Sequence, residues 1–117
     1  MLRVLTLLAA AAAAAASGPA CYDDSGATVD WFIAIKDSNA GTYAIASSAS
    51  GKLQQSSENL QDGTRGGVSL TVQQLWNKQY STGAYNDEPG FKASSKFGHT
   101  KGFVVADETQ AIWMVHR

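Results

Sequence analysis

The stretch Gly98–Arg117, GHTKGFVVADETQAIWMVHR, decides the fold because it holds two apolar runs on either side of a polar segment. Gly102 to Ala106 and Ala111 to His116 are rich in β-branched and aromatic residues, which are favoured in strands. The intervening residues Asp107-Glu108-Thr109-Gln110 have the polar character of a turn. The stretch therefore predicts two strands joined by a short turn.

The second of these strands is apolar on both faces. Ile112-Trp113-Met114-Val115 has no polar residue in alternation, which is typical of a central strand covered on both sides. Chain ends are usually polar and poorly ordered, yet the sequence stops two residues after Val115. We therefore expect further sequence to follow this strand in the natural protein.

Two more strands are predicted nearer the N-terminus. Residues 29–36, VDWFIAIK, are β-branched and aromatic, and residues 41–47 alternate Tyr43 and Ile45 with smaller side chains. The segment between them, residues 37–41, has turn chemistry, so the pair is predicted to form a hairpin.

The middle of the chain predicts a loop, one helix and a further strand. Residues 47–67 are rich in Ser, Gly, Gln and Asn and show no sustained period, which indicates a surface loop. Apolar residues then recur at spacings of three and four, which predicts an amphipathic helix over residues 69–78. Residues 81–87 are predicted to form a short strand that ends in a turn over residues 86–90.

The N-terminal residues 1–20 are predicted to be a secretory signal peptide. Arg3 precedes the apolar run Val4–Ala16, and small residues follow that run. The alternative, a membrane-spanning helix, requires ~20 apolar residues, and this run is shorter. We therefore expect no membrane span, and we expect residues 21–117 to form one small domain in a secreted or lysosomal protein.

A single cysteine, Cys21, lies at the start of this predicted domain. In an oxidising compartment a lone cysteine is expected to have a partner. Its sulfur could form a disulfide with another chain, remain a free thiol, or bridge to a segment outside these residues. Cys21 is thus a disulfide candidate whose partner the sequence does not contain.

The charge of the chain is slightly negative, with nine Lys and Arg against ten Asp and Glu. Such a balance disfavours tight binding of nucleic acid at neutral pH, but not at acid pH, where histidines gain charge. Residues 89–106 contain no acidic residue and hold His99 together with Lys92, Lys96 and Lys101. This segment is therefore a candidate site for an anion, the alternative being a solvated loop.

His99 and Lys101 lie two residues apart, so on an extended backbone their side chains project from the same face. An imidazole, which titrates near a pKa of about 6.5, can serve as a nucleophile or as an acid. An ammonium group beside it can stabilise a developing negative charge on oxygen. Such a pair suits a phosphodiester substrate. The two histidines and one cysteine lack metal-ligand spacing, so neither a metal nor a cofactor is predicted.

The chain resembles the N-terminal half of the deoxyribonuclease II family of acid endonucleases. The resemblance lies in short motifs that occur in the family's order: Cys21-Tyr22, Asp24-Ser25-Gly26, Val29-Asp30-Trp31-Phe32 with Lys36, Tyr85-Asn86-Asp87, Gly98-His99-Thr100-Lys101-Gly102, and Trp113 with Val115-His116. The segment Ser47–Gly67 resembles the family least.

This resemblance implies a phospholipase D-like fold of the α+β or α/β class. In that fold a mixed β-sheet with flanking helices occurs in two similar halves, and each half contributes one His-x-Lys motif to a shared site. His99 would be the catalytic histidine of the N-terminal half, Lys101 its phosphate-holding partner, and His116 a second histidine of the site. Lys92 and Lys96 would be possible phosphate contacts. The family's Asp after Lys101 falls here on Ala106, so Asp107 is given no catalytic role.

The resemblance implies metal-independent hydrolysis of DNA to 3′-phosphate products through a phosphohistidine. Because this chain contains one His-x-Lys motif, we expect it to be inactive or weak unless a C-terminal half or a second identical chain completes the site. The residues also leave open two functions that are not enzymatic. They are a secreted DNA-binding relative without turnover, and a small β-rich secreted interaction domain.

Overall fold

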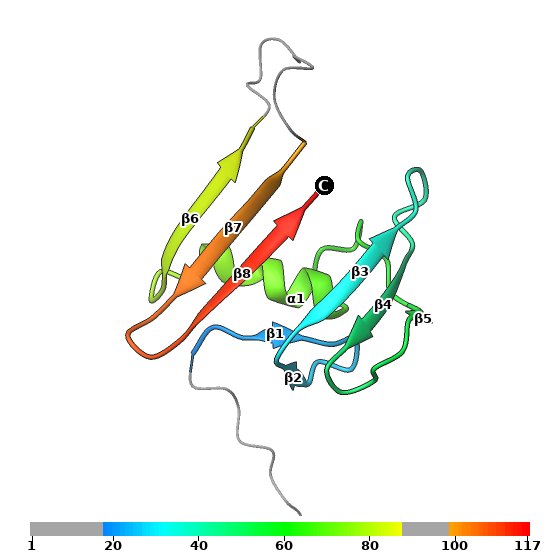
Figure 1. Cartoon of the computed structure of the whole chain (residues 1–117), viewed down its shortest axis with the longest axis horizontal. Helices are drawn as coiled ribbons and strands as arrows, with labels where there is room; N and C mark the ends of the chain where they lie inside the picture. Colours follow the sequence, from blue (N-terminus) through cyan, green and yellow to red (C-terminus); the bar gives the residue numbers. More distant parts are fainter. Residues whose placement is uncertain (1–17, 88–98) are drawn as a thin grey trace, which may run out of the picture.

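A computed structural model of the chain describes residues 18–87 and 99–117 (Figure 1). The predicted signal segment up to residue 17 lies outside these residues. The described part contains eight strands, one α-helix and one 3₁₀ turn. These are β1 (Cys21–Tyr22), β2 (Thr28–Val29), β3 (Phe32–Lys36), β4 (Tyr43–Ser47), β5 (Gln54–Gln55), α1 (Gly67–Gln73), the 3₁₀ turn Gln74–Trp76, β6 (Ser81–Asn86), β7 (Lys101–Ala106) and β8 (Ala111–His116).

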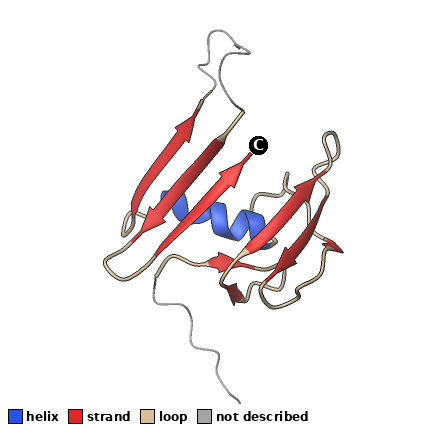
Figure 2. Cartoon of the chain, in the orientation of Figure 1, coloured by secondary structure: helices blue, strands red, loops and turns tan. Residues whose placement is uncertain are grey.

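The strands form three separate sheets, in the orders β1-β2, β3-β4-β5 and β6-β7-β8. Every pairing among the described residues is antiparallel. The described residues are therefore mostly β, with three antiparallel sheets and one short helix, where one mixed sheet with flanking helices was expected (Figure 2). The physical reason is local connectivity, since in each sheet the strands that follow one another in sequence pair with one another, and such neighbours are commonly antiparallel.

Most of the predicted elements are confirmed, with changed boundaries. The predicted strand over residues 29–36 is divided, because Thr28–Val29 pairs with β1 whereas Phe32–Lys36 pairs with β4. The predicted loop over residues 47–67 includes the two-residue strand β5. The helix begins two residues earlier than predicted, at Gly67.

The hydrophobic core lies between the β6-β7-β8 sheet and α1. Phe103, Val105 and Ile112 are buried on one face of that sheet, and Val72 and Leu75 pack against them. Val105 is fully enclosed at 0% exposure. Burying a side chain of this size contributes about 1.5–3 kcal/mol, so these few residues hold the sheet and the helix together.

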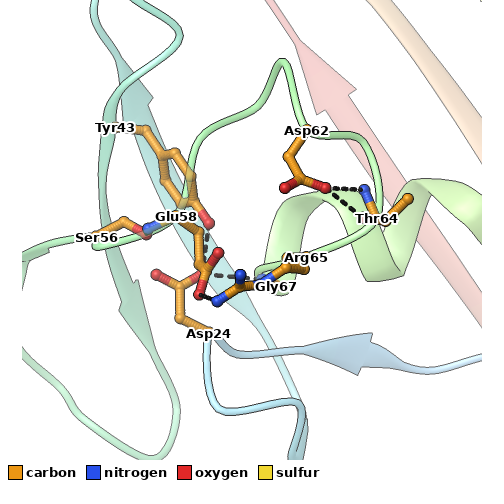
Figure 3. A network of polar contacts seen from close by, with 8 residues as sticks. All are labelled: Asp24, Tyr43, Ser56, Glu58, Asp62, Thr64, Arg65 and Gly67. Atoms are coloured by element: carbon orange, nitrogen blue, oxygen red, sulfur yellow. Dashed lines mark hydrogen bonds and ion pairs between the residues drawn. The ribbon is translucent and has the colours of Figure 1, made fainter.

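The β3-β4-β5 sheet is joined to the start of α1 by polar contacts (Figure 3). No side chain caps α1 locally, because Gly66 occupies the N-cap position. Asp24 supplies the missing acceptor: its Oδ1 accepts the Gly67 N–H at 2.8 Å and the Tyr43 hydroxyl at 2.5 Å. A carboxylate is favourable at the positive end of a helix, so this contact fixes α1 against β4.

One face of each larger sheet remains uncovered in the described residues. On β8, Trp113 is 69% exposed, and on β3, Ile33 and Ile35 are 60% and 59% exposed. The helix covers only the opposite face, which carries Val105 and Ile112. In the described residues the strand over residues 112–115 is thus covered on one face, and its coverage on the other face stays a prediction for the longer protein.

Candidate active site

The β7–β8 hairpin brings Lys101 and His116 together. They are directly opposite partners in its register, and Asn86 of β6 is the partner of Lys101 on the other side. Directly opposite residues project from the same face with their Cβ atoms about 4.5–5.5 Å apart. Asn86, Lys101 and His116 therefore form a row across the end of the sheet, and this row is here called the basic row.

The basic row belongs to the face that carries the hydrophobic core. Lys101 shares its face of β7 with Phe103 and Val105, because side chains alternate along a strand. Lys101 is half-buried, whereas His116 is exposed. The row therefore lies where the core ends and solvent begins, a position at which a charged ligand can reach the lysine and the imidazole together.

His99 precedes β7 and is exposed, and it lies two residues before Lys101. The residue between them, Thr100, is held by Asp87 from the end of β6. The Thr100 N–H donates to Asp87 Oδ2 at 2.8 Å, and the Asp87 N–H donates to the Thr100 carbonyl at 3.4 Å. This two-way contact continues the ladder beyond Lys101 and fixes the backbone beside His99.

Asp87 also has an oxygen that lacks a partner. Its Oδ1 is buried and accepts no hydrogen bond among the described residues. An unsatisfied buried acceptor costs about 1–3 kcal/mol, which makes it a ready partner for a donor that approaches the site.

Gly102 allows close packing on the opposite face of the hairpin. A Cβ atom at Gly102 would lie 2.5 Å from the Tyr85 hydroxyl oxygen, and it would also clash with the Met114 carbonyl oxygen. Tyr85 is the register partner of Gly102. The glycine of the His-Thr-Lys-Gly segment is therefore needed so that the Tyr85 ring can lie across β7.

A cleft of about 720 Å³ runs between β8 and β3. Lys36, His116 and Arg117, which are the last residues of these strands and the residue that follows β8, are among its lining residues. In Figure 1 the two strands run in the same direction, so their basic ends lie at the same end of the cleft. Lys36 of the other sheet thus lines the same cleft as His116 of the basic row.

Cys21 is half-buried and is not in a disulfide in the described part of the chain. It packs against the core residues Phe103, Val105 and Ile112, and burial raises the pKa of its thiol. The raised pKa keeps the sulfur protonated and less reactive at neutral pH. Lys92 and Lys96 lie outside the described residues.

Within residues 18–87 and 99–117 there is no group of three or more His, Cys, Asp or Glu side chains that could hold a metal ion. The helix in the same residues is too short and too polar to cross a membrane.

Sequence reasoning missed the contributions of Asp87, Lys36 and Arg117. Asp87 and Lys36 were noted only as parts of short motifs, because their roles depend on contacts between segments far apart in sequence. Asp87 directly follows a strand, and the sequence predicts a turn there, a position from which an acidic side chain often accepts backbone hydrogen bonds. The sequence gives a weaker indication of a functional role for Lys36, since this residue is simply the polar end of an apolar strand.

Comparison with known proteins agrees with the motif pattern. Residues 20–117 match the Deoxyribonuclease II family model. The chain is 37% identical to deoxyribonuclease-2-alpha of Rattus norvegicus, over 94% of this chain and 36% of that protein. It is 29% identical to deoxyribonuclease-2 of Caenorhabditis elegans, over 83% of this chain and 37% of that protein.

A third relative bears a different name. Plancitoxin-1 of Acanthaster planci is 30% identical over 96% of this chain and 36% of that protein. No solved structure gives a significant match. The chain spans about a third of the length of the curated relatives described. The family match over residues 20–117 and the identity to the rat enzyme show that the chain belongs to the deoxyribonuclease II family.

Proposed function

We propose that this chain supplies one half of the active site of an acid endonuclease that hydrolyses DNA without a metal ion. The observation that carries the proposal is the register of β7 and β8, which pairs Lys101 with His116 two residues from His99. Two imidazoles and an ammonium group at one end of a sheet suit a phosphodiester, because their positive charges can stabilise its anionic oxygens.

In the proposed first step, the His99 imidazole attacks the phosphorus atom while neutral. A bond forms between its nitrogen and phosphorus, and the bond from phosphorus to the 5′ oxygen breaks. The departing oxygen keeps the electron pair and takes a proton from a second, protonated histidine of the other His-x-Lys motif. Water then attacks the phosphorus and gives a proton to the second histidine, while the bond from phosphorus to the His99 nitrogen breaks. This leaves a 3′-phosphate end and restores both imidazoles.

The lysine and the second histidine of this chain have supporting roles. Lys101 holds the phosphate oxygens as negative charge develops on them, and His116 orients the phosphate from across the ladder. Lys92 and Lys96 contact neighbouring phosphates. Because one histidine must be neutral and the other charged, we expect an acidic optimum, close to the range in which imidazoles titrate.

The proposed reaction needs a second His-x-Lys motif, and the sequence given contains one. We propose that the second motif comes from the part of the family's sequence that this chain does not span, or from a second identical chain. Residues 1–20 are proposed to direct the protein into the secretory pathway, towards a lysosomal or extracellular location. Residues 21–117 then form the N-terminal part of the mature enzyme.

A chimera tests the proposal directly. This chain is fused to the part of rat deoxyribonuclease-2-alpha that it does not match, and cleavage of plasmid DNA is measured at acid pH with a chelator present. We expect cleavage, with 3′ ends that a polymerase extends only after phosphatase treatment. His99→Ala should abolish cleavage and retain DNA binding.

Four outcomes discriminate between the readings. Undiminished cleavage by the His99→Ala chimera would disprove the assigned role of His99. Binding without cleavage by the unmutated chimera would favour a DNA-binding relative, and loss of both would favour an interaction domain. Cleavage by this chain alone as a dimer in sedimentation would favour the two-chain site.

A further inference from the structure

Two of the sheets have edge strands that border the same cleft. β8 is the last strand of the β6-β7-β8 sheet, and β3 is the first strand of the β3-β4-β5 sheet. Residues of both strands line the cleft of about 720 Å³. Figure 1 shows the two strands running in the same direction on either side of it. A strand placed in the cleft could therefore be parallel to both neighbours or antiparallel to both.

The backbone of β8 directs hydrogen-bonding groups into this cleft. The Asp107 N–H donates to the Gln110 carbonyl at 3.0 Å, which sets the alternation of the β7–β8 ladder. Residues next to a paired position point their N–H and C=O groups the other way. Ala111, Trp113 and Val115 thus direct their backbone groups away from β7 and into the cleft.

β3 directs its own groups into the cleft from the other side. The Ser48 N–H donates to the Trp31 carbonyl at 3.0 Å, and the Asp37 N–H donates to the Thr42 carbonyl at 2.8 Å. Both contacts show that the odd-numbered residues of β3 point their backbone N–H and C=O groups towards β4. The even-numbered residues, Phe32, Ala34 and Lys36, therefore direct their backbone groups towards β8.

The surroundings of these backbone groups are apolar. Trp113 and Val115 are 69% and 57% exposed on β8, while Ile33 and Ile35 are 60% and 59% exposed on β3. Side chains of this kind on two adjacent unpaired edges are typical of strands in the interior of a sheet. A single extended segment would satisfy the backbone groups of both edges.

We propose that the cleft binds one extended, apolar strand from the part of deoxyribonuclease II sequences that this chain does not span. The strand pairs with β8 on one side and with β3 on the other. It joins the two sheets into one, in the order β6-β7-β8-strand-β3-β4-β5. Lys36 of β3 and His116 of β8 then lie on opposite sides of the inserted strand, at the same end of it.

The family comparison and the geometry both favour this occupant. The relatives are long enough to contain it, since this chain covers 36% of the rat enzyme. A second copy of this chain that paired through β8 alone would leave the edge of β3 unpaired. A strand that pairs with both edges satisfies two rows of backbone groups, which makes it the better match. The proposal depends on strand edges and not on the proposed chemistry, so either can fail without the other.

Amide exchange measured on the whole chain tests the proposal. The probes are overlapping synthetic peptides of roughly twelve residues, long enough to contain a typical strand. They cover the part of rat deoxyribonuclease-2-alpha outside its match to this chain. We expect one peptide to slow exchange at Trp113 and Val115 together with Ala34 and Lys36. Thr82 of β6, which faces the outer edge of its sheet, should not change.

Several results would overturn the proposal. Protection of only one of the two edges would exclude a strand that bridges them. Protection that depends on protein concentration in the absence of peptide would indicate self-association instead. Absence of protection with every peptide would also reject the docking site, whatever the activity of the chimera.

Two alanine-to-proline variants form a matched pair. Ala34→Pro removes an N–H that points into the cleft, whereas Ala84→Pro removes one that points away from β7 at the outer edge of β6. A proline is tolerated at a strand edge where no ladder bond is lost. We expect Ala34→Pro to weaken peptide binding about tenfold, the effect of one lost hydrogen bond. Ala84→Pro should bind as the unmodified chain does, and equal binding by both variants would overturn the pairing with β3.

Discussion

Lys101 lies directly opposite His116 in the β7–β8 ladder, at the edge of the buried core formed by Phe103 and Ile112. The register of the hairpin places the two side chains on one face of the sheet. Two predictions test what this row and the residues beside it do, and two others test what holds the sheets in place.

Lys101→Gln should weaken binding of duplex DNA at acid pH. The change removes one positive charge from the basic row, so the plot of log affinity against log salt should lose a slope of about 0.9, the value for one phosphate contact. Fluorescence anisotropy of a labelled duplex at several salt concentrations measures the slope. Lys78→Gln, an exposed lysine after the 3₁₀ turn, is the matched control and should leave the slope unchanged. An equal loss in both variants would mean that charge alone, and not position, controls binding.

Asp87→Ala should loosen the backbone beside His99. It removes the acceptor of the Thr100 N–H, a hydrogen bond to a carboxylate worth about 1.5–3 kcal/mol. Amide exchange at Thr100 should become faster, and cleavage by the chimera should fall. Asp62→Ala, which removes the acceptor of the Thr64 hydroxyl on a surface loop, should have no effect on cleavage. Unchanged exchange at Thr100 would show that the rest of the ladder is sufficient.

Gly102→Ala should destabilise the hairpin by about 1–3 kcal/mol, the usual cost of inserting atoms where no space exists. The added methyl group would collide with the Tyr85 ring and with the Met114 carbonyl. Gly83→Ala is the control, since a Cβ there meets nothing within 4 Å. It should be neutral or stabilise by about 0.5–1 kcal/mol, because glycine weakens strands. Thermal unfolding compares the two variants, and similar melting temperatures would contradict the assigned packing.

Tyr43 should make stability depend on pH in the alkaline range. Burial and the hydrogen bond to Asp24 raise the pKa of Tyr43 from 10.0 to about 12. A raised pKa means that the folded state favours the protonated phenol. The resulting stabilisation is complete below pH 10 and is lost as the pH rises towards 12. Tyr43→Phe should lower stability at neutral pH and flatten this alkaline decline, as urea unfolding at several pH values would reveal. A decline as steep in the variant would assign the effect to another group.

The strands of the hairpins were predictable because their signals are local. Residues 102–106 and 111–116 are β-branched and flank a polar turn, and the structure has β7 and β8 at nearly these bounds. The pairing of Lys101 with His116 follows from the length of that turn, although the motif alone pointed only to His99 and Lys101.

Other features could not be predicted because they depend on contacts between distant segments. The start of α1 at Gly67 depends on Asp24, which is 43 residues away. The position of β3 and β8 on either side of one cleft depends on how the two sheets are arranged, and no local sequence pattern predicts that arrangement. The apolar character of Trp113 and Ile33 indicated interior strands, but not that both would border one cleft.

The turn at Asp107 affects the stability of the β7–β8 hairpin at low pH. Its carboxylate accepts the backbone N–H groups of Thr109 and Gln110 and the Thr109 hydroxyl, and these bonds lower the pKa of Asp107. A lowered pKa means that this contribution is kept as the solution is acidified and is lost only below the ordinary range of aspartate. The loop that connects β7 to β8 is thus expected to keep its hydrogen bonds in mildly acidic solution.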